Sequence, residues 1–225
     1  MFVTDFIEKA QFFNDYLILQ CTTIDTESEI PTNFPAPSSL INDFPITDEK
    51  ILNIIRSLNP NKAHGWDGIS VRMIKLSDAA LVTPLKIIFE NCLRGGLFLK
   101  VWKYANVVPV HKKKEKNLKK NYRPISLLSI FGKILVKPIY DTLSSHLVSC
   151  NLLNPNQSGF RPSDSTINQL ISITHTILKA FDCNPPLHVR SVYLNISKAF
   201  ERVWHDGLIY KLKRCGVSGD LLALI

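Results

Sequence analysis

Several segments of this chain carry apolar residues at helical spacing, and this periodicity constrains the fold more than any other feature. Shorter runs predict helices from Thr47 to Leu58 and from about Thr83 to Leu93, ended by Asn59–Pro60 and Gly95–Gly96. An amphipathic helix usually packs its apolar stripe against other elements, so we expect the longest one, from Asp164 to Phe181, to lie in the core. In that helix, positions at i, i+3, i+4 and i+7 form one face: Ile167, Leu170, Ile171, Thr174, Ile177, Leu178 and Phe181.

Other segments have the patterns of strands, an interrupted helix and a tether. Residues 106–110 are a short apolar run that fits a β-strand, and residues 126–128 fit the second arm of a hairpin. Pro138 interrupts the helical run 131–147, which favours a kink or a break, since an interior proline costs about 3 kcal/mol. Residues 2–19 have helical spacing, and residues 22–45 are rich in Ser, Thr, Pro and acid. The predicted fold class is α/β (α+β), mostly helical with a few short strands.

Positive charge is concentrated in the turn between the two predicted strands. Residues 1–50 carry nine acidic and two basic groups, so the remaining chain carries 25 basic and ten acidic groups. Such a balance suits a polyanion, RNA or DNA; a nuclear-localisation patch is the competing interpretation. Only Glu115 offsets the basic residues of the turn, which are Lys112, Lys113, Lys114, Lys116, Lys119, Lys120 and Arg123.

Cysteine usage and hydropathy bear on the compartment. The five cysteines lie far apart with no paired spacing, which favours reduced thiols over a disulfide framework or a zinc site. The chain has no run of about 18 apolar residues, so no membrane-spanning segment is expected. We therefore expect an intracellular protein, in the cytoplasm, the nucleus or both, with no membrane partner.

Five stretches of the chain together resemble one known family. From about Ile51 to Ile225 the sequence is similar to the first part of the reverse transcriptase of non-LTR retrotransposons, especially the jockey-like elements of animals. The five blocks stand in that family's order and spacing: NPNKAHGWDGIS (59–70), VWKYANVVPVHKKKEK (101–116), NYRPISLLSIFGKIL (121–135), LLNPNQSGFRPSDST (152–166) and YLNISKAFERVWHDG (193–207).

The last block implies a substituted catalytic position. Asn195 stands where the family has its first catalytic Asp, and Phe200 stands where the family has its aromatic gate against ribonucleotides. The intact family uses Mg²⁺, which takes carboxylate oxygens, whereas Asn195 offers one neutral carbonyl. The chain reaches Ile225 without the family's Tyr-x-Asp-Asp pair. The resemblance therefore implies a truncated domain that holds no cofactor and is inactive in RNA-templated DNA synthesis as it stands.

The resemblance also assigns binding residues and domains. Lys112 or Lys113, Arg123 and Phe200 would contact the incoming nucleotide. Arg161, in the Gly-Phe-Arg-Pro segment, would contact nucleic acid, together with Lys114, Lys116, Lys119 and Lys120. The implied architecture is that of a right-hand polymerase: an N-terminal helix and acidic tether (1–46), fingers (47–189) and the start of the palm (190–225), whose first strand would end near residues 194–196.

Three functional hypotheses follow from the sequence. The first is a truncated, inactive reverse transcriptase domain that still binds RNA or DNA. The second is a fragment of a longer, active RNA-directed DNA polymerase. The third is an interaction module whose exposed palm edge docks onto another polymerase copy.

Overall fold

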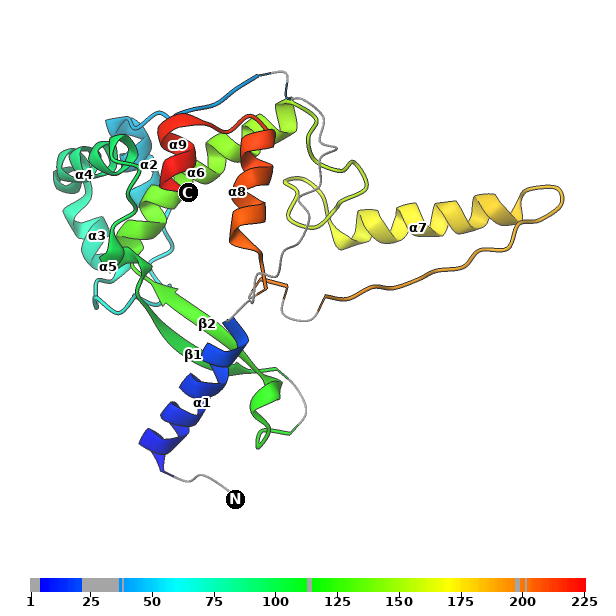
Figure 1. The fold of residues 1–225 in the computed structure, drawn as a ribbon, viewed down its shortest axis with the longest axis horizontal. Coiled ribbons are helices and arrows are strands. Elements are labelled where there is room, and N and C mark those ends of the chain that lie inside the picture. The colour runs from blue at the N-terminus through cyan, green and yellow to red at the C-terminus, as the bar shows by residue number, and fades with distance from the viewer. Residues whose placement is uncertain (1–4, 22–36, 38, 113–114, 197–198, 201) are drawn as a thin grey trace.

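Helices from both ends of the chain enclose the hydrophobic core. The computed structural model describes residues 5–21, 37, 39–112, 115–196, 199–200 and 202–225. The core helices lie on one side of the molecule (Figure 1), and they bury Ile55, Ile74, Phe89, Ile134 and Leu221 almost completely. Phe44, which precedes the first of them, belongs to the same core. These helices are α2 (Asp48–Ser57), α3 (Val71–Ser77), α4 (Val82–Arg94), α6 (Ile130–Ser149) and α9 (Gly219–Leu224).

The helix boundaries follow from capping residues in the sequence. Thr47 caps α2, because its hydroxyl accepts a hydrogen bond from the Lys50 N–H at 3.2 Å. Ser70 caps α3 in the same way, through the Met73 N–H. Helix α4 ends at Arg94, where Gly96 adopts a positive φ of 59° that suits glycine. The predicted helices near residues 47–58 and 83–93 are therefore confirmed.

A two-stranded hairpin projects from the core, as Figure 1 shows. Strand β1 (Ala105–His111) pairs antiparallel with β2 (Tyr122–Leu128), and Val108 lies opposite Ile125. The short helix α5 (Lys100–Lys103) leads into β1, and a 3-10 turn, η2 (Lys119–Asn121), leads into β2. The expected hairpin is confirmed, and its second strand begins four residues earlier than the sequence pattern indicated.

Helix α6 passes through Pro138 without a break, so of the two outcomes expected there, a kink or a break, the break does not occur. The helix is continuous from Ile130 to Ser149, and Pro138 itself is buried. Ile134 and Leu135, one turn earlier, have no exposed surface. Burial of this face supplies more free energy than the missing backbone hydrogen bond costs.

The 164–181 helix forms, but its expected place in the core is wrong. Helix α7 (Thr166–Phe181) has no buried residue, and it extends away from the core helices (Figure 1). No other described element covers its apolar stripe, so Leu170 and Ile171 remain more than 60% exposed. Periodicity determines which residues share a face, but burial of that face needs a neighbouring element.

The expected palm strand is also wrong for the described residues. Residues 187–196 have no regular secondary structure, and Leu194 is 91% exposed. A strand needs a partner for its backbone groups, and β1 and β2 pair only with each other. The remaining elements are a 3-10 turn η1 (Asp78–Leu81), α8 (His205–Arg214) and an N-terminal helix α1 (Phe6–Cys21), which lies beside the hairpin (Figure 1).

Candidate nucleotide and nucleic-acid interface

A cavity of about 370 Å³ lies on the hairpin and gathers four of the residues that the sequence singled out, Lys120 among them. Lys112, Arg123 and Phe200 line it together, although Phe200 is 77 positions after Arg123. Lys120 and Tyr122 line it from the hairpin. Lys113 and Lys114, also predicted as binding residues, lie outside the described residues. The cavity therefore combines positive charge with aromatic surface.

Strand pairing explains why the two main cations lie together. The Lys112 N–H donates to the Asn121 carbonyl at 2.8 Å, which extends the ladder one step beyond His111 and Tyr122. Residues two apart on a strand share a face, so Lys112 and Arg123 lie on the same face of the hairpin as diagonal neighbours. The positive charges of two such neighbours repel each other, so an anion bound between Lys112 and Arg123 would reduce this repulsion.

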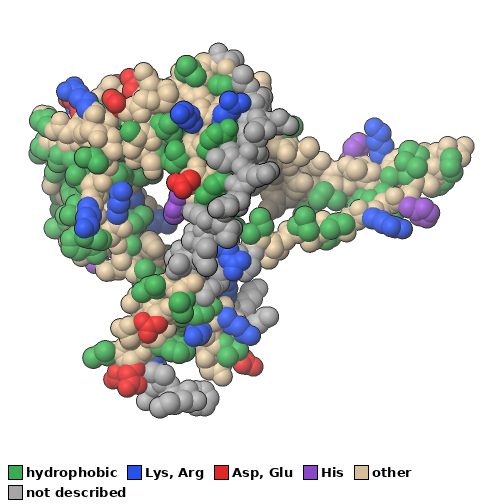
Figure 2. Space-filling view, in the orientation of Figure 1, with side chains coloured by type: hydrophobic (Ala, Val, Ile, Leu, Met, Phe, Trp, Pro, Cys, Tyr) green, Lys and Arg blue, Asp and Glu red, His purple; other side chains and the backbone are tan. Residues whose placement is uncertain are grey.

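Hydrogen bonds to backbone carbonyls hold the described part of the basic loop, residues 115–121, against the start of β2. Asn121 is buried, and its side-chain N–H donates to the Glu115 carbonyl at 2.8 Å. The Tyr122 hydroxyl donates to the Lys116 carbonyl at 2.8 Å. Lys116 and Lys120 remain exposed, and Figure 2 shows Lys and Arg side chains on the surface around the hairpin. Among the described residues, no ion pair neutralises any cation of this loop.

Helix α1 packs against the same hairpin and changes the environment of one lysine. The Phe13 ring meets Tyr122 edge to face, with centroids 4.8 Å apart. The Lys119 ammonium lies 4.4 Å from the Phe12 ring centroid and 4.8 Å from that of Tyr16. Lys119 therefore makes cation–π contacts with α1 instead of standing free on the loop.

Helix α1 also supplies cavity residues that sequence reasoning missed. Tyr16 and Leu17 form part of the cavity wall. Leu17 belongs to the apolar stripe of the N-terminal helix. Such a stripe predicts that this face of the helix is packed, but it does not indicate which element it packs against. Only the docking of α1 on the hairpin brings these side chains to the cavity.

The Gly-Phe-Arg-Pro segment reaches the cavity through an aromatic contact. The rings of Phe160 and Phe200 meet edge to face with centroids 6.2 Å apart, and both side chains are mostly exposed. Arg161, next to Phe160, is half-buried. The segment predicted to contact template thus lies next to the residue predicted to contact the nucleotide.

The N-terminus of α7 already has a negatively charged partner. Asp164 accepts a hydrogen bond from the Ser165 N–H at 2.7 Å and another from the Asn168 side chain at 3.1 Å. These hydrogen bonds, the Ser165 one above all, lower the pKa of Asp164 below its ordinary value. Ser165 caps the helix by accepting from the Asn168 N–H. This arrangement supports a capping role for the segment, and it leaves Arg161 as the group there that would attract phosphate.

Asn195 lies apart from these residues. It is exposed, lies in the irregular segment 187–196, and is not part of the cavity wall. In the described part of the chain, no group of three or more His, Cys, Asp or Glu side chains could hold a metal ion. Mg²⁺ prefers charged oxygen ligands.

Comparisons with known proteins match this chain to polymerases of mobile elements. The reverse transcriptase (RNA-dependent DNA polymerase) family pattern matches residues 110–224. The chain is 36% identical over 171 residues to the probable RNA-directed DNA polymerase from transposon BS of Drosophila melanogaster, which covers 76% of the chain and 19% of that protein. It is 33% identical over 195 residues to the RNA-directed DNA polymerase from mobile element jockey of the same species, covering 86% of the chain and 20% of that protein.

The chain therefore belongs to the reverse transcriptase family. Its relatives place it among the polymerases of non-LTR retrotransposons of the jockey type, as the sequence blocks predicted. A further relative, the probable RNA-directed DNA polymerase from transposon X-element of Drosophila melanogaster, is 31% identical over 176 residues, or 76% of this chain and 19% of that protein. The chain spans about a fifth of the length of these curated relatives. Within the described residues, no helix is long and apolar enough to span a membrane.

Proposed function

We propose that this segment is the fingers and the first edge of the palm of a right-hand polymerase, and that it binds a nucleotide and RNA or DNA through its hairpin. One observation carries this proposal: a single cavity gathers Lys112, Arg123 and Phe200. By this assignment the fingers correspond to residues 47–189 and the palm begins near residue 190.

The cavity suits the triphosphate and sugar of a nucleotide. The planar guanidinium of Arg123 can hold two phosphate oxygens at once, and Lys112 adds a second charge on the same face. Phe200 contributes an aromatic ring to the wall, where it would limit the space beside the sugar. In this proposal the two cations bind and orient the phosphates, and Phe200 sets the preference for the sugar.

The exposed lysines of the loop extend the positive surface beyond the cavity. Lys116 and Lys120 have no carboxylate partner among the described residues. Neutralising phosphates with such cations releases counterions and drives sequence-independent binding. Arg161 would add a contact next to Phe160. The proposed partner of this surface is the backbone of an RNA or DNA strand.

Asn195 would make this segment defective in polymerisation. In the intact family, bound Mg²⁺ stabilises charge during phosphoryl transfer. A neutral amide replaces one negative charge at the position that resembles the catalytic Asp, and the described residues hold no cluster that substitutes for it. We therefore propose that nucleotide and nucleic-acid binding remain while catalysis is impaired.

An intracellular location is part of the proposal. The described cysteines Cys92, Cys150, Cys183 and Cys215 are all free thiols. Burial raises the pKa of Cys92 and of Cys215, which favours the unreactive thiol form. Reduced, buried thiols suit a reducing compartment, such as the cytoplasm or the nucleus, where RNA and DNA are also available.

Nucleotide binding by the purified chain tests this proposal. A fluorescent deoxynucleoside triphosphate should bind the wild-type chain, and Arg123→Ala should weaken binding by about tenfold or more, because a hydrogen bond to a charged group contributes about 1.5–3 kcal/mol. Lys112→Ala should weaken it as well. The matched controls are Arg94→Ala and Lys62→Ala, which remove exposed cations far from the cavity. If the Arg123 variant binds the nucleotide as tightly as the controls do, the assignment of the cavity is wrong.

A further inference from the structure

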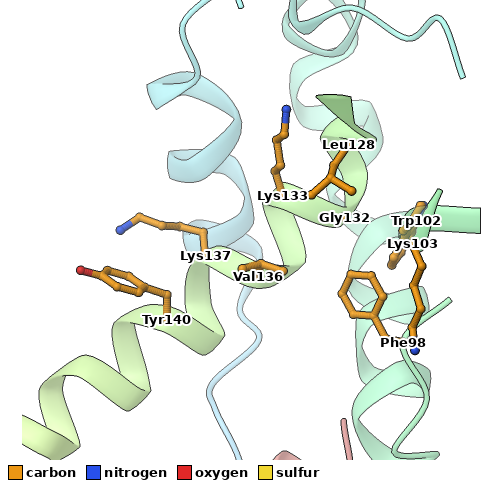
Figure 3. A pocket seen from close by; sticks show the side chains of 9 residues that line it. All are labelled: Phe98, Trp102, Lys103, Leu128, Gly132, Lys133, Val136, Lys137 and Tyr140. Carbon is orange, nitrogen blue, oxygen red and sulfur yellow. The ribbon is translucent and has the colours of Figure 1, made fainter. Parts of the chain in front are cut away.

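The outer face of α6 carries a second cavity, on the helical core instead of the hairpin. It has a volume of about 520 Å³, and its wall is formed mainly by Phe98, Trp102, Leu128, Val136 and Tyr140 (Figure 3). None of the residues assigned to the nucleotide cavity lines it. Val136 is 47% exposed and Tyr140 is 51% exposed, so apolar surface stands open to solvent here.

The floor of this cavity is closely packed because α5 and α6 approach each other at a glycine. A Cβ atom added at Gly132 would lie 3.1 Å from the Trp102 Cβ and 3.5 Å from the Phe98 ring. The Trp102 ring meets the rings of Phe89 and Phe98 edge to face, with centroids 5.9 and 5.8 Å away. Trp102 itself is 8% exposed. The cavity is therefore a preformed depression in a well-packed part of the core.

The depression continues along α6 as a groove. A neighbouring cavity of about 420 Å³ shares Phe98, Val136 and Tyr140 with the first and adds Leu143. Positions 132, 136, 140 and 143 repeat at the spacing of one helix face. At a rise of about 1.5 Å per residue, the groove follows α6 for about 16 Å, or three helical turns.

Three lysines form the rim of the groove. The aliphatic stems of Lys103, Lys133 and Lys137 line the cavity, while the ammonium groups of Lys133 and Lys137 point away from Val136 (Figure 3). Lys137 has a partner, since its ammonium lies 2.6 Å from the Asp141 carboxylate. Lys103 and Lys133 make no ion pair with any described residue. The rim thus offers two uncompensated positive charges beside an apolar floor.

We propose that this groove binds an acidic amphipathic helix of a partner protein. Apolar residues at i, i+4 and i+7 of the partner would fill the depression around Val136 and Tyr140, and flanking Glu or Asp side chains would pair with Lys103 and Lys133. A stacked nucleic-acid base fits less well, because the floor offers few hydrogen-bonding groups and the Trp102 ring is largely covered. The positive charge of the rim favours a negatively charged partner, and the apolar floor favours a helix with one apolar face.

A designed peptide tests the proposal without knowledge of the natural partner. The probe is a fluorescein-labelled helical peptide of about 15 residues, with Leu and Phe on one face and Glu on the flanks. A control peptide of the same composition spreads the Leu and Phe around the helix. The purified chain should bind the first peptide and should bind the second at least about tenfold more weakly, as measured by fluorescence anisotropy. Equal binding of the two peptides would overturn the proposal.

Variants of the chain locate the binding surface. Val136→Asp places a charge on the floor and should weaken binding of the acidic peptide by about tenfold or more. The matched control is Ile87→Asp, because Ile87 is 55% exposed on α4 and lies outside the groove. Circular dichroism and thermal unfolding check that both variants fold. An unchanged affinity of a folded Val136→Asp variant would refute docking in the groove.

A charge reversal decides the question if Val136→Asp does not fold. The double variant Lys103→Glu, Lys133→Glu changes only exposed side chains; it should weaken binding of the acidic peptide and strengthen binding of a peptide that carries Lys in place of Glu. Lys62→Glu, Lys179→Glu is its control, with the same change in net charge on exposed residues outside the groove. If both double variants behave alike, rim pairing is refuted. If a single-stranded RNA of about ten nucleotides binds the groove and the acidic peptide does not, the groove is a nucleic-acid surface and the proposal is wrong.

Discussion

The salt dependence of RNA binding is the quantity that most directly tests the basic hairpin. The described cations of the loop and cavity are Lys112, Lys116, Lys119, Lys120 and Arg123. The contacts of Lys119 with Phe12 and Tyr16 remove it from the count, so four cations are free to meet phosphate. For a single strand, the slope of log K against log salt is about −0.7 per phosphate contact, so these four cations should contribute about −2.8 to the slope.

A triple variant turns this count into a measurement. Replacing Lys112, Lys120 and Arg123 by Ala should flatten the slope by about 2, because three phosphate contacts are lost. A 5′-labelled RNA of about 12 nucleotides, titrated by fluorescence anisotropy between about 50 and 200 mM salt, gives the slope for each variant. The control replaces three exposed lysines that belong neither to the loop nor to the cavity, which keeps the change in net charge the same: Lys50, Lys62 and Lys179.

The comparison of the two triple variants refutes or supports the reasoning. If binding depends on the hairpin, the control should keep the wild-type slope. If both variants flatten it equally, the net charge of the chain drives binding and the hairpin has no special role. If neither variant changes the slope, the phosphate contacts lie elsewhere.

Three further predictions concern catalysis, packing and pH. In a chimaera that carries this segment in place of the matching part of an active relative, Asn195→Asp should raise primer extension by about a hundredfold or more; no gain would contradict the assignment of that position. Gly65→Ala should lower the free energy of unfolding by about 1–3 kcal/mol in urea titrations, because the added Cβ would lie 2.7 Å from the backbone at the β2–α6 junction. The control is Gly159→Ala, whose Cβ would meet open space and should leave the free energy of unfolding unchanged. Arg56 donates to Asp78 at 2.8 Å, and this hydrogen bond lowers the pKa of that carboxyl below its ordinary value. The stability this pair contributes is present above the ordinary pKa of an aspartate, about 4, and is lost as pH falls through the lowered value. Asp78→Asn should therefore flatten the acid limb of a stability–pH curve.

Local chemistry in the sequence was sufficient to predict much of the fold. Thr47 followed by acidic residues identified the start of α2, and the glycines at 95 and 96 identified the end of α4. The apolar run before Lys112 identified β1. Each signal acts within a few residues through capping, backbone freedom or side-chain alternation, so no knowledge of the rest of the chain is required.

Predictions that depend on a distant partner failed. Pro138 predicts a kink or a break, yet α6 continues through it, with the surrounding face buried. The stripe around Leu170 predicts a core helix, yet no described element covers it. The family resemblance predicts a palm strand that ends near residues 194–196, yet no described strand pairs with that segment. In each case the elements packed around the segment, or their absence among the described residues, decided the outcome.

The sequence by itself determined the family, the capped helices, the hairpin and the excess of positive charge in its turn, because these are properties of neighbouring residues or of ordered blocks. Tertiary structure alone decided that Phe200 joins Lys112 and Arg123 in one cavity, that α1 contributes Tyr16 and engages Lys119, and that α6 has an open apolar face rimmed by lysines. These features bring together groups that are far apart in the chain. Such proximity depends on how the elements pack, and packing depends on the sum of many weak contacts that no local pattern records.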